Sequence, residues 1–296
     1  MAKTSRQRVT RKKAAPKSKR TSSKPTKKKK TNKTRKAKSS GDGPLFVIDS
    51  QEEGIIALQE YGLCKTPSDI KTISNWEQLQ ATTADIAEEG HALDGFYGKS
   101  AIQIVLYGPA GVGKSSFASY FPANTVVFDS LTGFEKQCFQ YHCDEHFDGD
   151  WGKDNGFYSY SKGPKQAAKT DWPEWLDGLN AIRQAGINVV LIAHSSPPKE
   201  YNNPDGPNYD RHNVYLDKET WSQTHRWSRA NLFYNYHVEV DKKGARAKAK
   251  SGSEERHIYT QWSPAFDAKN QYGLEAMIEA GSNGEEAFEA FKAEFE

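Results

Sequence analysis

The residues with the most specific chemistry lie in one glycine-rich segment, Gly108-Pro109-Ala110-Gly111-Val112-Gly113-Lys114-Ser115. It fits the pattern G-x-x-x-x-G-K-[ST], which predicts a phosphate-binding loop where it joins a strand to a helix. Glycines let backbone N–H groups converge on a phosphate, and the following helix adds its positive N-terminal end. We expect this loop and Ser116 to bind ATP, with Lys114 on the β- and γ-phosphates and Ser115 on Mg²⁺. The alternative is a glycine-rich turn that arises by chance.

A carboxylate at a neighbouring strand end is the partner that such a loop requires. Val126-Val127-Phe128 is an apolar run that ends at Asp129. In a parallel sheet this side chain reaches the same edge as the loop, so we expect Asp129 to hold Mg²⁺ through water. Ser130 could assist it. An aspartate that only ends a strand is the alternative.

Hydrolysis of ATP also needs a group that activates or orients the attacking water. The run Leu45-Phe46-Val47-Ile48 leads into Asp49-Ser50-Gln51-Glu52-Glu53, so either Glu52 or Glu53 could take this role. Both could equally be solvated surface glutamates. His194 follows a further strand and could sense the γ-phosphate, although a histidine that merely ends a strand fits as well.

The elements that must position these residues alternate between strands and helices. Apolar runs predict strands at 45–48, 102–107, 125–128 and 188–192. Helical spacing of apolar residues predicts helices at 75–93, 115–120, 131–143, 172–185 and 285–296. This alternation predicts an α/β fold with a mostly parallel β-sheet flanked by helices. Two strands at about 231–240 and 256–262 predict a small antiparallel C-terminal extension, and polar composition predicts an insertion at 144–170 and a loop at 196–216.

Charge is distributed unevenly along the chain of 296 residues. Residues 1–41 contain 18 of the 41 Lys and Arg residues and no Asp or Glu, which leaves 23 basic against 38 acidic residues in the rest. Like charges and the lack of aromatic residues predict a disordered basic tail at 1–43. We expect a nucleotide-binding domain at 44–275 and a C-terminal helix at 276–296. The tail predicts DNA as a partner, with a solubilising or localisation tail as the alternative.

Composition excludes some classes of protein. No apolar run approaches the roughly 20 residues of a membrane span, and the basic start lacks the apolar segment of a secretory signal. We therefore expect an intracellular, DNA-associated protein with no membrane partner. The three cysteines are too few for a disulfide framework. Cys138, His142, Cys143 and His146 suggest zinc, but their spacing is loose and no second cysteine pair exists, so we interpret this segment as a helix.

Four segments resemble the RecA-like P-loop ATPases of phages and prophages, an AAA-type nucleotide-binding family. They are IVLYGPAGVGKSSFASYFP, TVVFDSLTGFEKQC, NVVLIAHS and RHIYTQWSPAFDAKNQYGL, and the resemblance extends over about 44–275. It implies a RecA-like core and a role in DNA recombination and the handling of single strands. It also implies that Lys114 and Ser115 bind phosphate and Mg²⁺, that Asp129 is the second acidic motif, and that His194 occupies the position of a γ-phosphate sensor.

The order of two segments differs from the family pattern. The strand in PLFVIDSQEEG, with its catalytic carboxylate, follows the phosphate loop in the family, whereas here it precedes the loop. Blocks 44–98 and 99–124 stand as though they had exchanged places. A parallel sheet can tolerate this, because its sites form at strand ends whatever the chain order. Gln51 stands where a simple Asp-x-Glu match would put the carboxylate, which leaves Glu52 and Glu53 as alternatives.

Further residues suggest contacts with DNA. The 196–216 loop and the turn at 242–250 are basic, and in the loop aromatic side chains that suit stacking on bases alternate with the cations. Each could equally be a solvated loop. The residues concerned in the loop are Lys199, Tyr201, Tyr209, Arg211 and His212. By the resemblance, Arg256 and Lys269 could reach the nucleotide of a neighbouring subunit, which implies a homo-oligomer.

Together these features predict an ATPase that acts on DNA, single-stranded DNA in particular, in recombination, annealing or repair. One alternative is a nucleic-acid-binding protein that uses ATP as a switch ligand with little turnover. Another is a P-loop small-molecule kinase.

Overall fold

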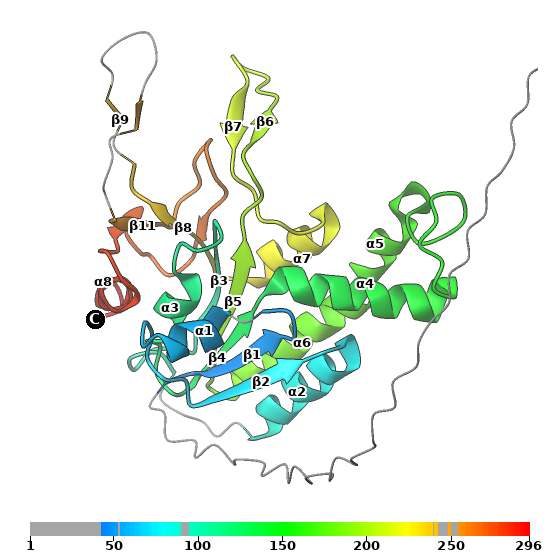
Figure 1. The fold of residues 1–296 in the computed structure, drawn as a ribbon, viewed down its shortest axis with the longest axis horizontal. Coiled ribbons are helices and arrows are strands. Elements are labelled where there is room, and N and C mark those ends of the chain that lie inside the picture. The colour runs from blue at the N-terminus through cyan, green and yellow to red at the C-terminus, as the bar shows by residue number, and fades with distance from the viewer. Residues whose placement is uncertain (1–42, 53, 90–94, 239, 242–247, 250–253) are drawn as a thin grey trace, which may run out of the picture. The chain divides into compact units, whose positions relative to one another are not determined.

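The computed structural model describes residues 43–52, 54–89, 95–238, 240–241, 248–249 and 254–296, which belong to one unit (Figure 1). Glu53 and the predicted basic tail, apart from Gly43, lie outside these residues. The basic turn from Lys242 to Lys250 also lies outside them, except for the two residues of β10 (Lys248–Ala249).

A nine-stranded sheet lies at the centre of the described chain, in the order β13-β11-β8-β3-β5-β4-β1-β2, with β12 paired to β8. The six strands from β8 to β2 in this order run parallel. The pairs that involve β11, β12 and β13 are antiparallel. The strands are β1 (Leu45–Asp49), β2 (Asp69–Ile73), β3 (Gln103–Gly108), β4 (Thr125–Asp129), β5 (Asn188–His194), β8 (Ala230–Tyr236), β11 (Arg256–Tyr259), β12 (Lys269–Asn270) and β13 (Met277–Glu279). The predicted α/β fold with its antiparallel extension is confirmed.

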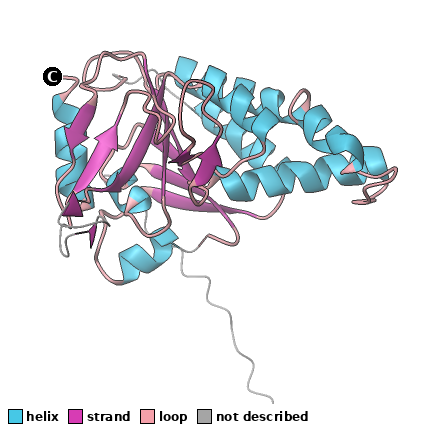
Figure 2. Cartoon of the chain, turned by 90° about the horizontal axis from the view of Figure 1, so that it is seen from above, coloured by secondary structure: helices cyan, strands magenta, loops and turns pink. Residues whose placement is uncertain are grey.

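Helices cover both faces of this sheet (Figure 2). One face carries α1 (Gly54–Glu60), α3 (Lys114–Ala118) and α8 (Gly284–Ala293). The other face carries α2 (Trp76–Glu89), α4 (Leu131–Phe147), α6 (Asp171–Gln184) and α7 (Lys218–Trp227). A short helical turn, η1 (Ser159–Ser161), and α5 (Lys162–Ala167) stand between α4 and α6.

The strand sequences explain this three-layer arrangement. Successive side chains of a strand point to opposite faces, so a strand covered on both sides needs apolar residues throughout. In β5, Val189 and Leu191 pack in the core on the α6 side, whereas Val190 and Ile192 pack in the core on the α3 side. A tryptophan cluster fills the first core, where Trp76 of α2 stacks on Trp172 of α6 with ring centroids 5.9 Å apart.

β1 and β2, which precede the phosphate loop in the sequence, lie together at one side of the sheet. β1 pairs in parallel with β4, which places Leu45 beside Val126 and Ile48 beside Asp129. β2 then forms the edge of the sheet beside β1. The strand that precedes the phosphate loop in the sequence therefore lies beyond β4 in space, and its carboxyl end reaches the same edge of the sheet as the other parallel strands.

Several elements differ from the sequence-based expectation. The 196–216 segment, predicted as a loop, contains a hairpin of β6 (Lys199–Tyr201) and β7 (Tyr209–Arg211). The helix predicted to end at 143 continues to Phe147, and the insertion at 144–170 also contains η1 and α5. α1 and α7 were not predicted. β10 falls in the predicted basic turn and pairs with β9 (Val240–Asp241), which lies just before that turn. At the C-terminal end, β13 belongs to the main sheet, and α8 packs in the same hydrophobic core as α3.

No helix among the described residues is long and apolar enough to cross a membrane.

Candidate nucleotide site

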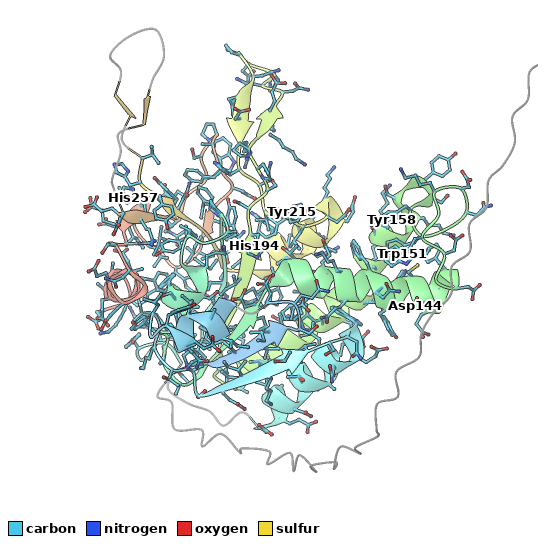
Figure 3. The ribbon with its side chains drawn as sticks, viewed as in Figure 1. Asp144, Trp151, Tyr158, His194, Tyr215 and His257 are labelled. Carbon is cyan, nitrogen blue, oxygen red and sulfur yellow. The ribbon has the colours of Figure 1, made fainter. Side chains whose placement is uncertain are left out.

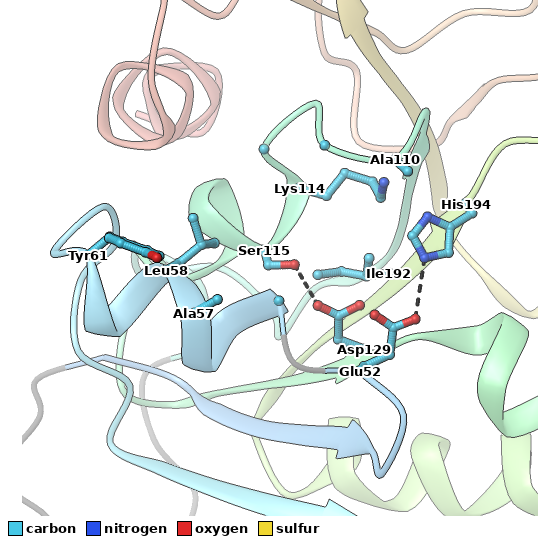
Figure 4. A pocket seen from close by; sticks show the side chains of 13 residues that line it. Glu52, Ala57, Leu58, Tyr61, Ala110, Lys114, Ser115, Asp129, Ile192 and His194 are labelled. Atoms are coloured by element: carbon cyan, nitrogen blue, oxygen red, sulfur yellow. Dashed lines mark hydrogen bonds and ion pairs between the residues drawn. The ribbon is translucent and has the colours of Figure 1, made fainter.

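Four parallel strands bring the predicted site residues to one edge of the sheet (Figure 4). β3 leads into the glycine-rich loop, β4 ends at Asp129 and β5 ends at His194. β1 ends three residues before Glu52. Since β5 lies between β3 and β4, and β1 lies beyond β4, residues far apart in the sequence converge on one cavity of about 390 Å³.

The structure explains why glycine stands at three positions of the loop. A Cβ atom on Gly108 would lie 2.0 Å from the backbone oxygen of Tyr234 in the neighbouring strand β8, so only glycine fits there. Gly111 and Gly113 have φ values of 75° and 101°, which side chains of L-amino acids rarely adopt. α3 begins directly after Gly113. The predicted strand–loop–helix context of the motif is therefore present.

Lys114 lies buried beneath the loop, with 5% of its surface exposed. Its Nζ donates hydrogen bonds to the backbone oxygens of Gly108 and Pro109, at 3.1 and 2.9 Å. Burial lowers the pKa of this ammonium group to about 8, although the carboxylates of Asp129 and Glu52 act in the opposite direction. A phosphate in the cavity would supply the anionic partner that the buried cation lacks.

Ser115 and Asp129 contact each other directly. Ser115 Oγ donates to Asp129 Oδ2 at 2.6 Å, and the carboxylate is 5% exposed. Burial raises the pKa of Asp129, an effect that the hydrogen bond from Ser115 partly offsets. A hydroxyl and a carboxylate side by side at the cavity wall are the hard oxygen ligands that Mg²⁺ prefers. These residues therefore fit the predicted magnesium site.

Glu52 and His194 form a second polar pair on the opposite side of Asp129. His194 Nε2 lies 3.5 Å from Glu52 Oε1, and Ser130 Oγ donates to the same oxygen at 3.2 Å. The hydrogen bond with His194 is the main cause that lowers the pKa of Glu52, against the effect of burial. Nδ1 of His194 is buried without a partner. Asp49, the other acid of this strand end, instead accepts a hydrogen bond from Gln137 at 2.8 Å.

Of the two glutamates left open by the sequence, Glu52 lines the cavity. Glu53 lies outside the described residues, so its role stays a prediction.

The far end of the cavity is formed by residues that the sequence did not suggest. Ala57, Leu58 and Tyr61, in and just after α1, line it together with Ala110 of the loop. Tyr61 is 78% exposed. The cavity thus runs from Glu52 and His194 past the loop to an aromatic side chain (Figure 4). The helical spacing of Ala57, Leu58 and Tyr61 could have revealed α1, but not its place beside the loop.

Other predicted residues lie around the cavity without lining it. Gly108, Pro109, Val112 and Ser116 are not among its lining residues. Ser116 Oγ instead donates to the backbone oxygen of Leu63 at 3.0 Å, so a contact between Ser116 and nucleotide stays a prediction.

The two cations that were considered for a neighbouring subunit make contacts within their own chain. Arg256 Nε donates to the backbone oxygen of Val112 at 2.7 Å, and its guanidinium lies 4.8 Å from the ring centre of Tyr236. Lys269 Nζ donates to the backbone oxygens of His225 and Ser228 near the end of α7. Arg256 therefore supports the phosphate loop from outside.

A phosphate loop between strand and helix, with a serine–carboxylate pair at the same edge of a mostly parallel sheet, defines a P-loop nucleotide-binding protein of the ATPase class. Residues 122–272, just over half of the chain, match the family described as AAA domain, and the chain belongs to this family. A search of curated proteins finds no match to the chain. The matched segment contains Asp129 and His194 and begins after the phosphate loop.

Proposed function

We propose that this protein binds ATP with Mg²⁺ and hydrolyses it, and that it uses this cycle on single-stranded DNA in recombination, annealing or repair. The observation that carries the proposal is the convergence of Lys114, the Ser115–Asp129 pair and the Glu52–His194 pair on one cavity. Binding alone would need only the loop and its serine. The Glu52–His194 pair adds a carboxylate placed to act on water.

Each residue has a distinct task in this mechanism. Lys114 gives up its contacts with loop carbonyls and binds the β- and γ-phosphates, whose charge keeps it protonated. Ser115 and Asp129 hold Mg²⁺, which when bound neutralises phosphate charge. Glu52 is ionised at neutral pH because its pKa is lowered, and it orients the attacking water as a hydrogen-bond acceptor. His194 pairs with Glu52 and is placed to respond to the γ-phosphate.

Two matched pairs of variants test this assignment. Glu52→Gln should lower kcat by about 100-fold, the usual contribution of an acid–base group, and leave ATP binding nearly unchanged. Glu53→Gln tests the alternative carboxylate, and it should retain wild-type turnover when Glu52 is the residue that orients the water. Ser115→Ala should weaken Mg²⁺-dependent binding, and Ser116→Ala tests separately whether the adjacent hydroxyl contacts the nucleotide. Wild-type turnover in Glu52→Gln would contradict the mechanism.

The DNA part of the proposal rests on the β6–β7 hairpin and on the basic tail. In the hairpin, the rings of Tyr201 and Tyr209 lie 5.2 Å apart. The guanidinium of Arg211 lies 5.8 Å from the ring of Tyr201 and 5.5 Å from that of Trp262. Tyr201 and Trp262 are 44% and 58% exposed. The exposed rings suit stacking on bases, whereas Arg211, which pairs with Asp267 at 3.7 Å, helps to hold the rings in place.

Few residues separate the hairpin from His194, which lines the nucleotide cavity. β6 begins five residues after His194, and Tyr215, which follows β7, donates its backbone N–H to the oxygen of His194 at 2.8 Å. A change in the position of His194 on binding ATP therefore acts on both ends of the hairpin segment. This connection supports coupling between nucleotide and DNA binding.

Binding of a fluorescent single-stranded oligonucleotide tests the DNA assignment. Tyr201→Ala should weaken binding at least fivefold, since stacking on one base contributes roughly 1–3 kcal/mol. Tyr160→Ala, which changes a tyrosine that is 94% exposed on the segment before α5, is the matched control. Deleting residues 1–40 should weaken binding most at low salt and reduce its salt dependence. An unchanged affinity in both changed proteins would refute DNA as the partner.

ATPase measurements with and without single-stranded DNA separate the alternatives. Turnover that DNA stimulates supports the proposal. Tight ATP binding without turnover would favour a switch ligand, and phosphoryl transfer to a small acceptor without DNA would favour a kinase.

A further inference from the structure

Three side chains with metal-binding groups lie together outside the nucleotide site. His142 and His146 are one turn apart on the same face of α4, with ring centroids 4.4 Å apart. Asp171, the first residue of α6, faces them. Each of the three residues offers one ligand atom, and these atoms all lie within 4.8 Å of one another.

The buried ring of His142 is incompletely satisfied by the protein. It is 2% exposed, and its Nδ1 lies 2.5 Å from Asp171 Oδ2. Its Nε2 has no hydrogen-bond partner. The rings of Phe147 and Phe157, with centroids 6.0 and 6.3 Å away, give it an apolar surround. One ion cannot bind both nitrogens of a ring, so Nδ1, which faces Asp171, is the nitrogen of His142 available to an ion in this cluster.

We propose that His142, His146 and Asp171 form a binding site for one divalent transition-metal ion, with Zn²⁺ as the ion that matches the ligands. Two imidazoles and one carboxylate are a ligand set typical of Zn²⁺, and they leave a fourth tetrahedral position for water. Mg²⁺ prefers oxygen ligands, which separates this site chemically from Ser115 and Asp129.

The spacing of the ligand atoms is compatible with such an ion. Zinc lies about 2.0–2.2 Å from nitrogen and oxygen ligands, so two ligand atoms of a tetrahedral site are roughly 3.4 Å apart. The contact between His142 and Asp171 has to lengthen by about 0.9 Å to admit the ion. The exposed ring of His146 has freedom to move inward.

The site lies where a bound ion would join two helices. His146 lies just before the segment 148–170 that contains η1 and α5, and Asp171 lies just after it. An ion held by both would join the two ends of this segment and fix α4 to α6. In Figure 3 the labelled residues Asp144, Trp151 and Tyr158 mark this region, well apart from His194 at the nucleotide cavity.

The structure also explains why the sequence did not support a metal site. The zinc pattern in the sequence combined His142 and His146 with Cys138 and Cys143, and these two cysteines belong to the apolar core on this face of the sheet. The carboxylate that completes the cluster comes from the start of the next long helix.

Titration of the full-length, chelator-treated protein with Zn²⁺ alone, followed by calorimetry, tests the proposal. We expect one equivalent of saturable binding and a higher thermal midpoint with Zn²⁺. His146→Ala changes an exposed ligand and should fold normally but bind at least ten-fold more weakly and lose the thermal shift. His237→Ala is the matched control, because His237 and His257 form another closely spaced histidine pair among the described residues, with ring centroids 4.3 Å apart.

Each outcome decides for or against the site. Loss of binding in His146→Ala, with wild-type binding in His237→Ala and in Asp129→Asn, would support it. Absence of saturable Zn²⁺ binding in the wild type would overturn it and leave His142 and Asp171 as a helix-to-helix hydrogen bond. Equal binding by wild type and His146→Ala would overturn it as well. Co²⁺ provides a second readout, since its visible absorption reports tetrahedral nitrogen and oxygen ligands, and this absorption should disappear in His146→Ala.

Discussion

Replacing Lys114 by methionine should make the nucleotide-free protein more stable while it abolishes ATP binding. The ammonium group is 5% exposed, and its pKa is lowered from 10.5 to about 8. This difference corresponds to roughly 3 kcal/mol of destabilisation by the charged form in the folded state at neutral pH. Methionine removes the charge but also the hydrogen bonds to two loop carbonyls, each worth about 1 kcal/mol. The net expectation is a gain of about 1 kcal/mol in the free energy of unfolding.

The pH dependence gives an independent check on the same residue. Between pH 8 and 10.5 the unfolded chain retains the proton of Lys114 and the folded protein has lost it. The unfolded state then binds more protons, so the wild-type protein gains stability as pH rises, by up to about 2 kcal/mol between pH 8 and 9.5. The buried Cys138 thiol, with its raised pKa, acts in the opposite direction in both proteins. The difference between wild type and Lys114→Met therefore isolates the lysine.

Chemical denaturation without nucleotide at pH 7, 8, 9 and 9.5 measures both effects. At pH 7 the methionine variant should have the larger free energy of unfolding. The difference between the two proteins should become smaller as pH rises above 8. Parallel pH profiles for the two proteins, or a variant less stable than wild type at pH 7, would refute the conclusion that the loop holds a desolvated cation. Calorimetry with magnesium nucleotide should show no binding to the variant, since the cation for the phosphates is gone.

Three further predictions address other parts of the molecule. Gly108→Ala should destabilise the protein by about 3 kcal/mol in thermal denaturation, because the new Cβ would lie 2.0 Å from the oxygen of Tyr234. Glu135 has its pKa raised to about 7 by burial, so the folded state binds more protons than the unfolded state and stability should fall from pH 4.5 to 7. Glu135→Gln should remove this fall in denaturation experiments. Tyr61→Ala should raise KM for ATP about fivefold and leave kcat unchanged, since the ring lines the far end of the cavity.

Much of the fold could be predicted because its central strands carry a strong signal. β3, β4 and β5 are continuous apolar runs, as strands covered on both faces must be. The hairpin lacked such a signal, because β6 and β7 have three residues each and are held by pairing with each other at the surface. α7 was missed because the residues that it buries are Thr220 and Thr224, not apolar side chains.

One part of the site could be predicted from a local motif, whereas another part depends on contacts between distant segments. The phosphate loop is a local motif, and its strand–loop–helix context follows from neighbouring residues. The pairing of Glu52 with His194 depends instead on β1 lying beside β4 and β4 beside β5, an order that no local pattern encodes. The position of Tyr61 opposite the loop depends on the same long-range arrangement, so it too was missed.

The position of β1 beside β4 has a consequence for how the chain emerges from the ribosome. β1 and β2 are synthesised before their neighbour exists, so one side of β1 has unpaired N–H and C=O groups until Val126 and Val127 have been made. An unpaired strand edge is a template for wrong partners, and contacts between distant segments form slowly. Nascent chains arrested before β4 should therefore aggregate or recruit chaperones. Once β4 has left the exit tunnel and paired with β1, this tendency to aggregate should end.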